Sequence, residues 1–104
     1  MKSARTKACD ISPEIRRIVE ERDAGGCVIC NRRGHPNMHY IPRSAGGLGI
    51  AQNIVCGCLK CHDAYDNGNM REEYGKIIRE YLKSQYADWD ESKLYYKKYP
   101  WSAI

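Results

Sequence analysis

Two Cys-x-x-Cys pairs constrain this chain more than any other feature, because four thiolates at this spacing are a common ligand set for structural zinc. Cys27 and Cys30 form the first pair, and Cys58 and Cys61 form the second, with 27 residues between the pairs. A redox dithiol needs only one such pair. Four sulfurs close a tetrahedral coordination sphere, so we expect a structural Zn²⁺ rather than a catalytic one.

A metal ion suits the size of the chain, which has 104 residues and no Phe. A domain of this length buries roughly 65% of the surface that its unfolded form exposes, and a bound ion supplies additional cohesion. The sequence contains neither a membrane-spanning run nor a signal-peptide pattern. We therefore expect a soluble, cytoplasmic protein of small α+β fold, with residues 1–10 as a frayed basic tail and residues 11–104 as a single domain.

Two further cysteines, Cys9 and Cys56, lie outside the pairs. Cys56 is close enough to Cys58 to compete with it as a ligand. The pair of Cys58 with Cys61 keeps the usual spacing, so we expect Cys56 to pack inside the protein as a small apolar residue.

The net charge of +4 is unevenly distributed. Residues 1–50 carry nine Lys or Arg and five Asp or Glu, whereas residues 51–104 carry eight of each. A basic first half fits a polyanionic partner such as nucleic acid, and it also fits a solvated basic face.

Local patterns predict helices on both sides of a zinc-containing core over residues 27–68. Ser12 before Pro13 marks the start of a helix over residues 12–24, and Gly25 and Gly26 end it. Asn69, with Glu72 three residues later, predicts the start of a second helical region over residues 69–99. This second region carries an apolar stripe, predicted to be core, at Tyr74, Ile77, Ile78, Tyr81 and Leu82.

Within the core, the sequence predicts short strands over residues 38–41 and 53–55 and a helix over residues 60–67. The helix places His62 and Asp66 four residues apart on one face, where both can hold one divalent ion. His39 lies on the first strand as a free base. A lone histidine is more often structural than catalytic, so the hypothesis rests on the whole set.

The pattern His39-Tyr-Ile-Pro-Arg-Ser-x-Gly-Gly, followed by Asn53-Ile-Val-x-x-Cys-x-x-Cys-His62, resembles the zinc-containing branch of the HNH endonuclease family. The resemblance covers about residues 27–68. It implies a ββα-metal finger, in which two antiparallel strands and a helix surround one divalent ion, here flanked by further helices. It also implies a metal-dependent hydrolase that nicks or cuts DNA, such as a phage-encoded nuclease.

The resemblance assigns a role to each matched residue. His39 is the general base that activates the attacking water, and Asn53 holds the loop that orients it. His62 is a ligand of the catalytic ion, and Asp66 falls where many members place a further His ligand. A carboxylate there favours Mg²⁺ or Mn²⁺. Arg43, beside the base, is the expected nucleic-acid contact.

Met38 departs from the family pattern, because the residue before the base is commonly an Asp or His ligand. A thioether is a poor ligand for a hard cation. Three readings stay open: His62 and Asp66 hold the ion with water and substrate, His35 reaches the site, or the site is weak or inactive.

The expected partner is double-stranded DNA, and a double-strand cut would need two sites, hence a homodimer or another partner. The alternative functions are a non-catalytic zinc module that binds nucleic acid or protein, and a purely structural zinc fold. Two basic segments are candidate DNA contacts or simply surface cover: Lys2, Arg5 and Lys7 near the start, and Lys93, Tyr95, Tyr96, Lys97, Lys98, Tyr99 and Trp101 near the end.

Overall fold

A computed structural model describes residues 2–97 of the chain. Its elements follow in the order α1 (Ala4–Cys9), α2 (Pro13–Arg22), β1 (His35–His39), the 3-10 turn η1 (Arg43–Ala45), β2 (Ile54–Gly57), α3 (Leu59–Asp66), α4 (Arg71–Gln85) and the 3-10 turn η2 (Glu91–Lys93). The prediction of a small α+β fold is confirmed. None of the helices in this part of the chain is long and apolar enough to span a membrane.

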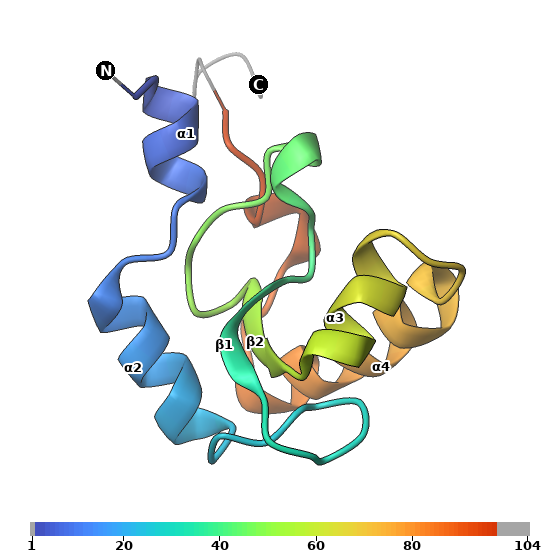
Figure 1. The fold of residues 1–104 in the computed structure, drawn as a ribbon. Helices are drawn as coiled ribbons and strands as arrows, with labels where there is room; N and C mark the ends of the chain where they lie inside the picture. The colour runs from blue at the N-terminus through green and yellow to red at the C-terminus, as the bar shows by residue number, and fades with distance from the viewer. Residues whose placement is uncertain (1, 98–104) are drawn as a thin grey trace.

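A two-stranded antiparallel sheet lies at the centre, with α2 on one side and α3 and α4 on the other (Figure 1). Met38 and Val55 pack from the sheet into a core that includes Ile78 and Leu82 of α4. Ile54 and Cys56 point the other way and pack with Val19 of α2. The alternation of side chains along a strand therefore divides the core into two clusters, and the prediction that Cys56 is buried is confirmed.

The start of α2 is as the sequence predicts, whereas the start of α4 is not. The Ser12 hydroxyl accepts a hydrogen bond from the Ile15 backbone N–H at 3.2 Å, with Pro13 in the first turn. The N-cap of α4 is Met70, which makes no side-chain capping bond, so the predicted cap at Asn69 is wrong. Two acidic residues, Glu72 and Glu73, still stabilise the first turn through the helix dipole.

Other predicted boundaries also shift. The first strand begins at His35 and ends at His39, so it starts earlier than predicted, and the second runs to Gly57. Within the helical region predicted to residue 99, α4 ends at Gln85, and the short helix expected after Asp90 is the 3-10 turn η2. Of its apolar stripe, Ile78 and Leu82 are fully buried, but Ile77 is 41% exposed because it lies at the edge of the packed face.

The prediction that residues 1–10 form a frayed tail is wrong. Residues 4–9 form α1, capped by Ser3, and the last of them, Cys9, is 2% exposed. The Arg5 guanidinium donates to the carbonyl oxygens of Arg43 and Ser44 at 3.3 and 3.0 Å. Gly49 allows the loop before β2 to lie against the end of α1, because a Cβ at position 49 would lie 2.0 Å from the Asp10 carbonyl oxygen.

A buried ion pair joins α2 to the sheet. Arg22 Nε lies 2.7 Å from Asp23 Oδ1, and the side chains are 10% and 0% exposed. Arg22 also donates to the carbonyls of Ala51 and Ile54, and Asp23 Oδ2 accepts from the Cys56 backbone N–H at 2.8 Å. The Tyr81 hydroxyl of α4 donates to Asp23 as well. The two buried charges, on Arg22 and Asp23, therefore both have partners, as the burial of charge requires.

The segment after η2 packs against the loop that contains Gly46 and Gly47. Leu94 is 2% exposed, and the Tyr96 backbone N–H donates to the Gly46 carbonyl at 2.8 Å. This position fits surface cover for the described part of the C-terminal segment. Lys98, Tyr99 and Trp101, which belonged to the same prediction, lie outside the described residues.

Candidate functional site

The four paired cysteines come together between the loop that precedes β1 and the start of α3. Their four Sγ atoms, from Cys27, Cys30, Cys58 and Cys61, all lie within 4.8 Å of one another. The Sγ atoms of Cys30 and Cys58 are 3.6 Å apart. Sulfurs bound tetrahedrally to zinc at about 2.3 Å lie about 3.8 Å from one another. The cluster therefore fits a metal ion such as zinc.

Local hydrogen bonding prepares this cluster for metal. Cys58 is the N-cap of α3, and its sulfur accepts a hydrogen bond from the Cys61 backbone N–H at 3.4 Å. That bond lowers the pKa of the Cys58 thiol to about 7, whereas burial raises the pKa of Cys61. A metal ion would have to displace a proton from Cys61, which couples metal binding to proton release.

Directly after Cys61 on α3, His62 and Asp66 face a pocket that the cysteines do not line. The Nε2 atom of His62 lies 2.8 Å from Asp66 Oδ2, with side chains 26% and 36% exposed. The i,i+4 spacing brings the imidazole and the carboxylate onto one face, as the sequence predicts. Arg71 lies near the same carboxylate, with 3.7 Å between its Nη2 and Asp66 Oδ1.

His39 ends β1 and is 7% exposed. Its Nε2 atom lies 2.9 Å from the carbonyl oxygen of Cys9, at the end of α1. A carbonyl can only accept, so this bond fixes the proton on Nε2 and leaves the lone pair on Nδ1. Burial is the largest influence on the ring and lowers its pKa below the ordinary 6.5.

The other charged groups near His39 act in both directions. Electrostatic interactions with Arg43 and His62 lower its pKa further, whereas the Cys9 carbonyl and the Asp66 carboxylate raise it. The net result is a lowered pKa, so the ring is neutral at pH 7 and able to accept a proton.

Arg43 is held by the segment that follows α1. Its Nη1 donates to the Cys9 carbonyl at 3.0 Å, and its Nη2 lies 2.7 Å from Asp10 Oδ1. Lys2 pairs with the other carboxylate oxygen of Asp10, also at 2.7 Å. These exposed ion pairs lower the pKa of Asp10, with Lys2 the larger influence. The Asp10 carboxylate is therefore an anion bound to Arg43, the residue that the sequence predicts to contact nucleic acid.

Asn53 is fully buried and holds the loop between the strands rather than facing the pocket. Its Oδ1 accepts from the Ile41 backbone N–H at 2.8 Å, and its Nδ2 donates to the carbonyls of Ile41 and Leu48 at 3.2 and 2.8 Å. Gly47 allows the loop to close, because a Cβ there would lie 1.7 Å from the Ile41 carbonyl oxygen. This network anchors the backbone two residues beyond His39.

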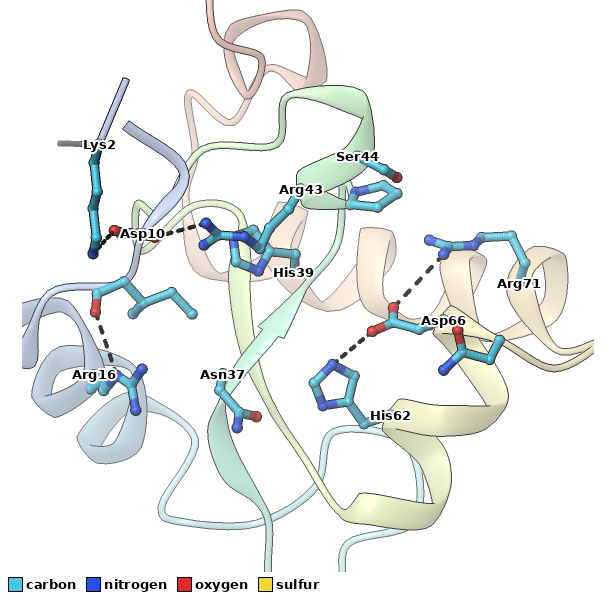
Figure 2. A pocket seen from close by; sticks show the side chains of 13 residues that line it. Lys2, Asp10, Arg16, Asn37, His39, Arg43, Ser44, His62, Asp66 and Arg71 are labelled. Atoms are coloured by element: carbon cyan, nitrogen blue, oxygen red, sulfur yellow. Dashed lines mark hydrogen bonds and ion pairs between the residues drawn. The ribbon is translucent and has the colours of Figure 1, made fainter. Parts of the chain in front are cut away.

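The structure brings His39, Arg43, His62 and Asp66 to the wall of one pocket of about 630 Å³. Figure 2 shows β1 at its centre, the α2 side at the left and α3 at the right. Basic side chains surround it, and two carboxylates, Asp10 and Asp66, face them. The basic residues are Lys2, Arg16, Arg43 and Arg71. The pocket wall thus carries more basic than acidic side chains, with Asp66 beside His62 on the α3 side.

Sequence reasoning missed several lining residues, and Asn53, one of its three catalytic candidates, does not line the pocket. Asp10, Arg16, Asn37 and Arg71 also line the pocket. The strand alternation that puts His39 in the pocket also marks Asn37, two residues earlier, as a signal that could have been used. His35 is exposed at the start of β1 and is not among the lining residues within 2–97. Met38 is fully buried.

Comparison with known proteins does not assign the chain to a family. No protein-family model matches the chain, and no curated protein matches it significantly.

Proposed function

We propose that the protein is a metal-dependent endonuclease of the HNH type, which hydrolyses phosphodiester bonds of duplex DNA. The carrying observation is the pocket that gathers a neutral imidazole, an imidazole–carboxylate pair and several guanidinium groups from separate elements. In this proposal β1, β2 and α3 correspond to the ββα-metal finger, and the four-cysteine cluster holds a structural zinc ion.

His39 takes the proton of the attacking water. Its Nε2 hydrogen bond to Cys9 supports this role, since the remaining ring nitrogen carries the lone pair. A positioned base of this kind contributes roughly 10²–10⁴ in rate. Asn53 acts through the loop backbone and is a positioning residue, not a group that touches the substrate.

His62 and Asp66 are the residues that would hold Mg²⁺ or Mn²⁺, and an imidazole nitrogen with a carboxylate oxygen suits such ions. When bound, the ion supplies neutralising charge for the phosphate and the leaving oxygen. Arg43 contacts the substrate phosphate, with Asp10 as the group that the phosphate displaces. Cleavage of both strands would need a second site, supplied by a second copy of the chain.

The test is nicking of supercoiled plasmid with Mg²⁺ or Mn²⁺ by the wild type and by His39→Ala. We expect His39→Ala to lose about 10²–10⁴ of the rate while it keeps its zinc. His35→Ala is the matched control, because this histidine lies on the same strand but is exposed and outside the pocket. Equal inertness of wild type and His39→Ala over several metals and salt conditions would end the nuclease proposal.

The pH dependence of cleavage provides a second test. A buried His39 with a lowered pKa stays neutral as the pH falls through 6.5, so the acidic limb of the wild-type rate profile should lie below pH 6.5. Residual cleavage by His39→Ala should lack that limb. A wild-type limb well above pH 6.5 would contradict His39 as the base.

A second candidate is a zinc module that binds DNA without cutting it. The observation in its favour is Met38, which is fully buried where the family carries a metal ligand. This function predicts DNA binding that weakens steeply with salt, is unchanged in His39→Ala, and is accompanied by no cleavage. The same plasmid assay, combined with a binding measurement, separates the two candidates.

A further inference from the structure

The proposed ion site lacks a ligand from the strand. Within residues 2–97, the four cysteines are the sole group of three or more His, Cys, Asp or Glu side chains whose ligand atoms lie within 4.8 Å of one another. His62 and Asp66 alone offer a divalent cation two protein atoms. Met38 cannot add a third, because it is fully buried and belongs to the α4 side of the core.

Asn37, the residue before Met38, has an unusual environment. Its Oδ1 is the only buried side-chain nitrogen or oxygen of the described residues that lacks a hydrogen-bond partner. Burying a polar atom without a hydrogen-bond partner is unfavourable, so each such atom calls for an explanation. The atom belongs to a pocket-lining residue, and Figure 2 shows the oxygen end of the amide on the side of His62.

The strand itself is irregular at this point. His35 pairs with Gly57 and Met38 pairs with Val55, so three steps along β1 match two steps along β2. An inserted residue of this kind bends a strand and re-aims a side chain. Beyond this irregularity, Asn37 lines the same pocket as His39, while Met38 between them packs into the core and His35 does not line the pocket.

Carbonyl oxygens of Asn are ordinary ligands of hard divalent cations, together with carboxylates and water. Asn37 would therefore add a neutral oxygen to the nitrogen of His62 and the oxygen of Asp66. Its orphan oxygen would gain the partner that it lacks in the protein alone.

We propose that Asn37 is the strand ligand of the divalent-cation site at His62 and Asp66, in place of the residue at position 38. This inference rests on the proposed function only for the purpose of the ion, since binding itself can be measured without DNA. It names a hard cation, Mg²⁺ or Mn²⁺, as the ligand of this side of the pocket.

The test is a titration of the zinc-loaded full chain with Mn²⁺, with free Mn²⁺ followed by its electron paramagnetic resonance signal. We expect Asn37→Ala to weaken Mn²⁺ binding at least tenfold, the low end of the loss seen when even a supporting group is removed. Asn37→Asp should tighten it by a similar factor, because a carboxylate adds charge at the same place. Asn67→Asp is the matched control: it adds the same charge to another pocket-lining asparagine.

The outcomes separate the two proposals. Equal affinity in wild type, Asn37→Ala and Asn37→Asp, or an equal gain in Asn67→Asp, would overturn the Asn37 assignment. If the wild type still nicks DNA with Mn²⁺ in that case, the nuclease proposal stands. Absence of Mn²⁺ binding in both wild type and Asn37→Asp at millimolar ion would also overturn the assignment. Zinc content and circular dichroism confirm that each variant is folded.

Discussion

Two turns of the same helix, α3, carry side chains of opposite character. At its start, Cys58 and Cys61 meet the first cysteine pair in a cluster of four sulfurs. One residue later, His62 begins a second set that Asp66 completes, and this set faces an open, basic pocket. The first set has the ligand number and softness for a closed zinc site. The second has nitrogen and oxygen atoms beside open space.

The comparison shows how a small chain can hold partly exposed side chains in place. His62 and Asp66 of α3 and Arg43 of η1 are partly exposed in the open pocket, so they have little packing of their own. The cysteine cluster fixes the start of α3 against the loop before β1, and Asn53 fixes the loop after β1. The cysteine cluster and the loop held by Asn53 thus position the side chains that line the open pocket.

The largest effect should follow from removing a cysteine ligand. Structural zinc contributes apparent binding free energies of about 10–16 kcal/mol in small domains, as much as the whole stability of an ordinary domain. We expect Cys61→Ser to lose zinc and cooperative unfolding, measured by metal analysis and thermal denaturation. Cys9→Ala is the control, because Cys9 is buried but outside the cluster. A folded Cys61→Ser without metal would refute the structural role.

The buried ion pair should give the next largest effect. Removing one partner of such a pair costs about 3–5 kcal/mol, and Asp23→Ala would strand Arg22 and the Cys56 backbone N–H. Urea denaturation should show this loss while zinc remains at one per chain. Asp88→Ala, at an exposed position, should change stability by about 0.5 kcal/mol or less. A similar small change in Asp23→Ala would contradict the role of the pair.

A change in the open site should affect function more than stability. Asp66→Ala should retain zinc and change stability only slightly, since exposed ion pairs contribute little, but it should lower Mn²⁺-dependent nicking about 10–100-fold. Asp63→Ala, an exposed carboxylate on the same helix, is the matched control. Loss of zinc in Asp66→Ala would show that the two metal sites are not separate.

The smallest effect concerns the anion that covers Arg43. Asp10→Asn removes the negative charge but not the shape, and Arg43 becomes available to a phosphate. We expect DNA binding, measured by fluorescence anisotropy at fixed salt, to tighten about two- to threefold, because surface ion pairs are weak. Weaker binding in Asp10→Asn would mean that Asp10 orders Arg43 rather than competing for it.

The sequence could predict those parts of the site that depend on local spacing. Cys-x-x-Cys pairs and the i,i+4 relation of His62 and Asp66 are short-range patterns, and the structure has both. The six residues of α1 show no apolar periodicity, and their position depends on tertiary contacts of Arg5 and Cys9. Sequence reasoning therefore missed that helix.

The sequence also could not predict the burial of the Arg22–Asp23 ion pair or the irregular pairing of β1. Arg22 and Asp23 look like the polar end of a helix, and only the packing of Tyr81 and the sheet against them makes them core residues. The register shift between His35 and Met38 depends on how β1 pairs with β2. Pairing of this kind is non-local, so the strand pattern alone could not locate it.

The most direct test of the account is an add-back of divalent ion to zinc-loaded protein that has been freed of other metals. Nicking of supercoiled plasmid and zinc content are measured on the same samples as Mn²⁺ or Mg²⁺ is restored. The account predicts one zinc per chain throughout, with nicking absent before the ion is added and restored after it. Nicking that ignores the added ion, or no nicking at any ion concentration while zinc stays bound, would contradict it.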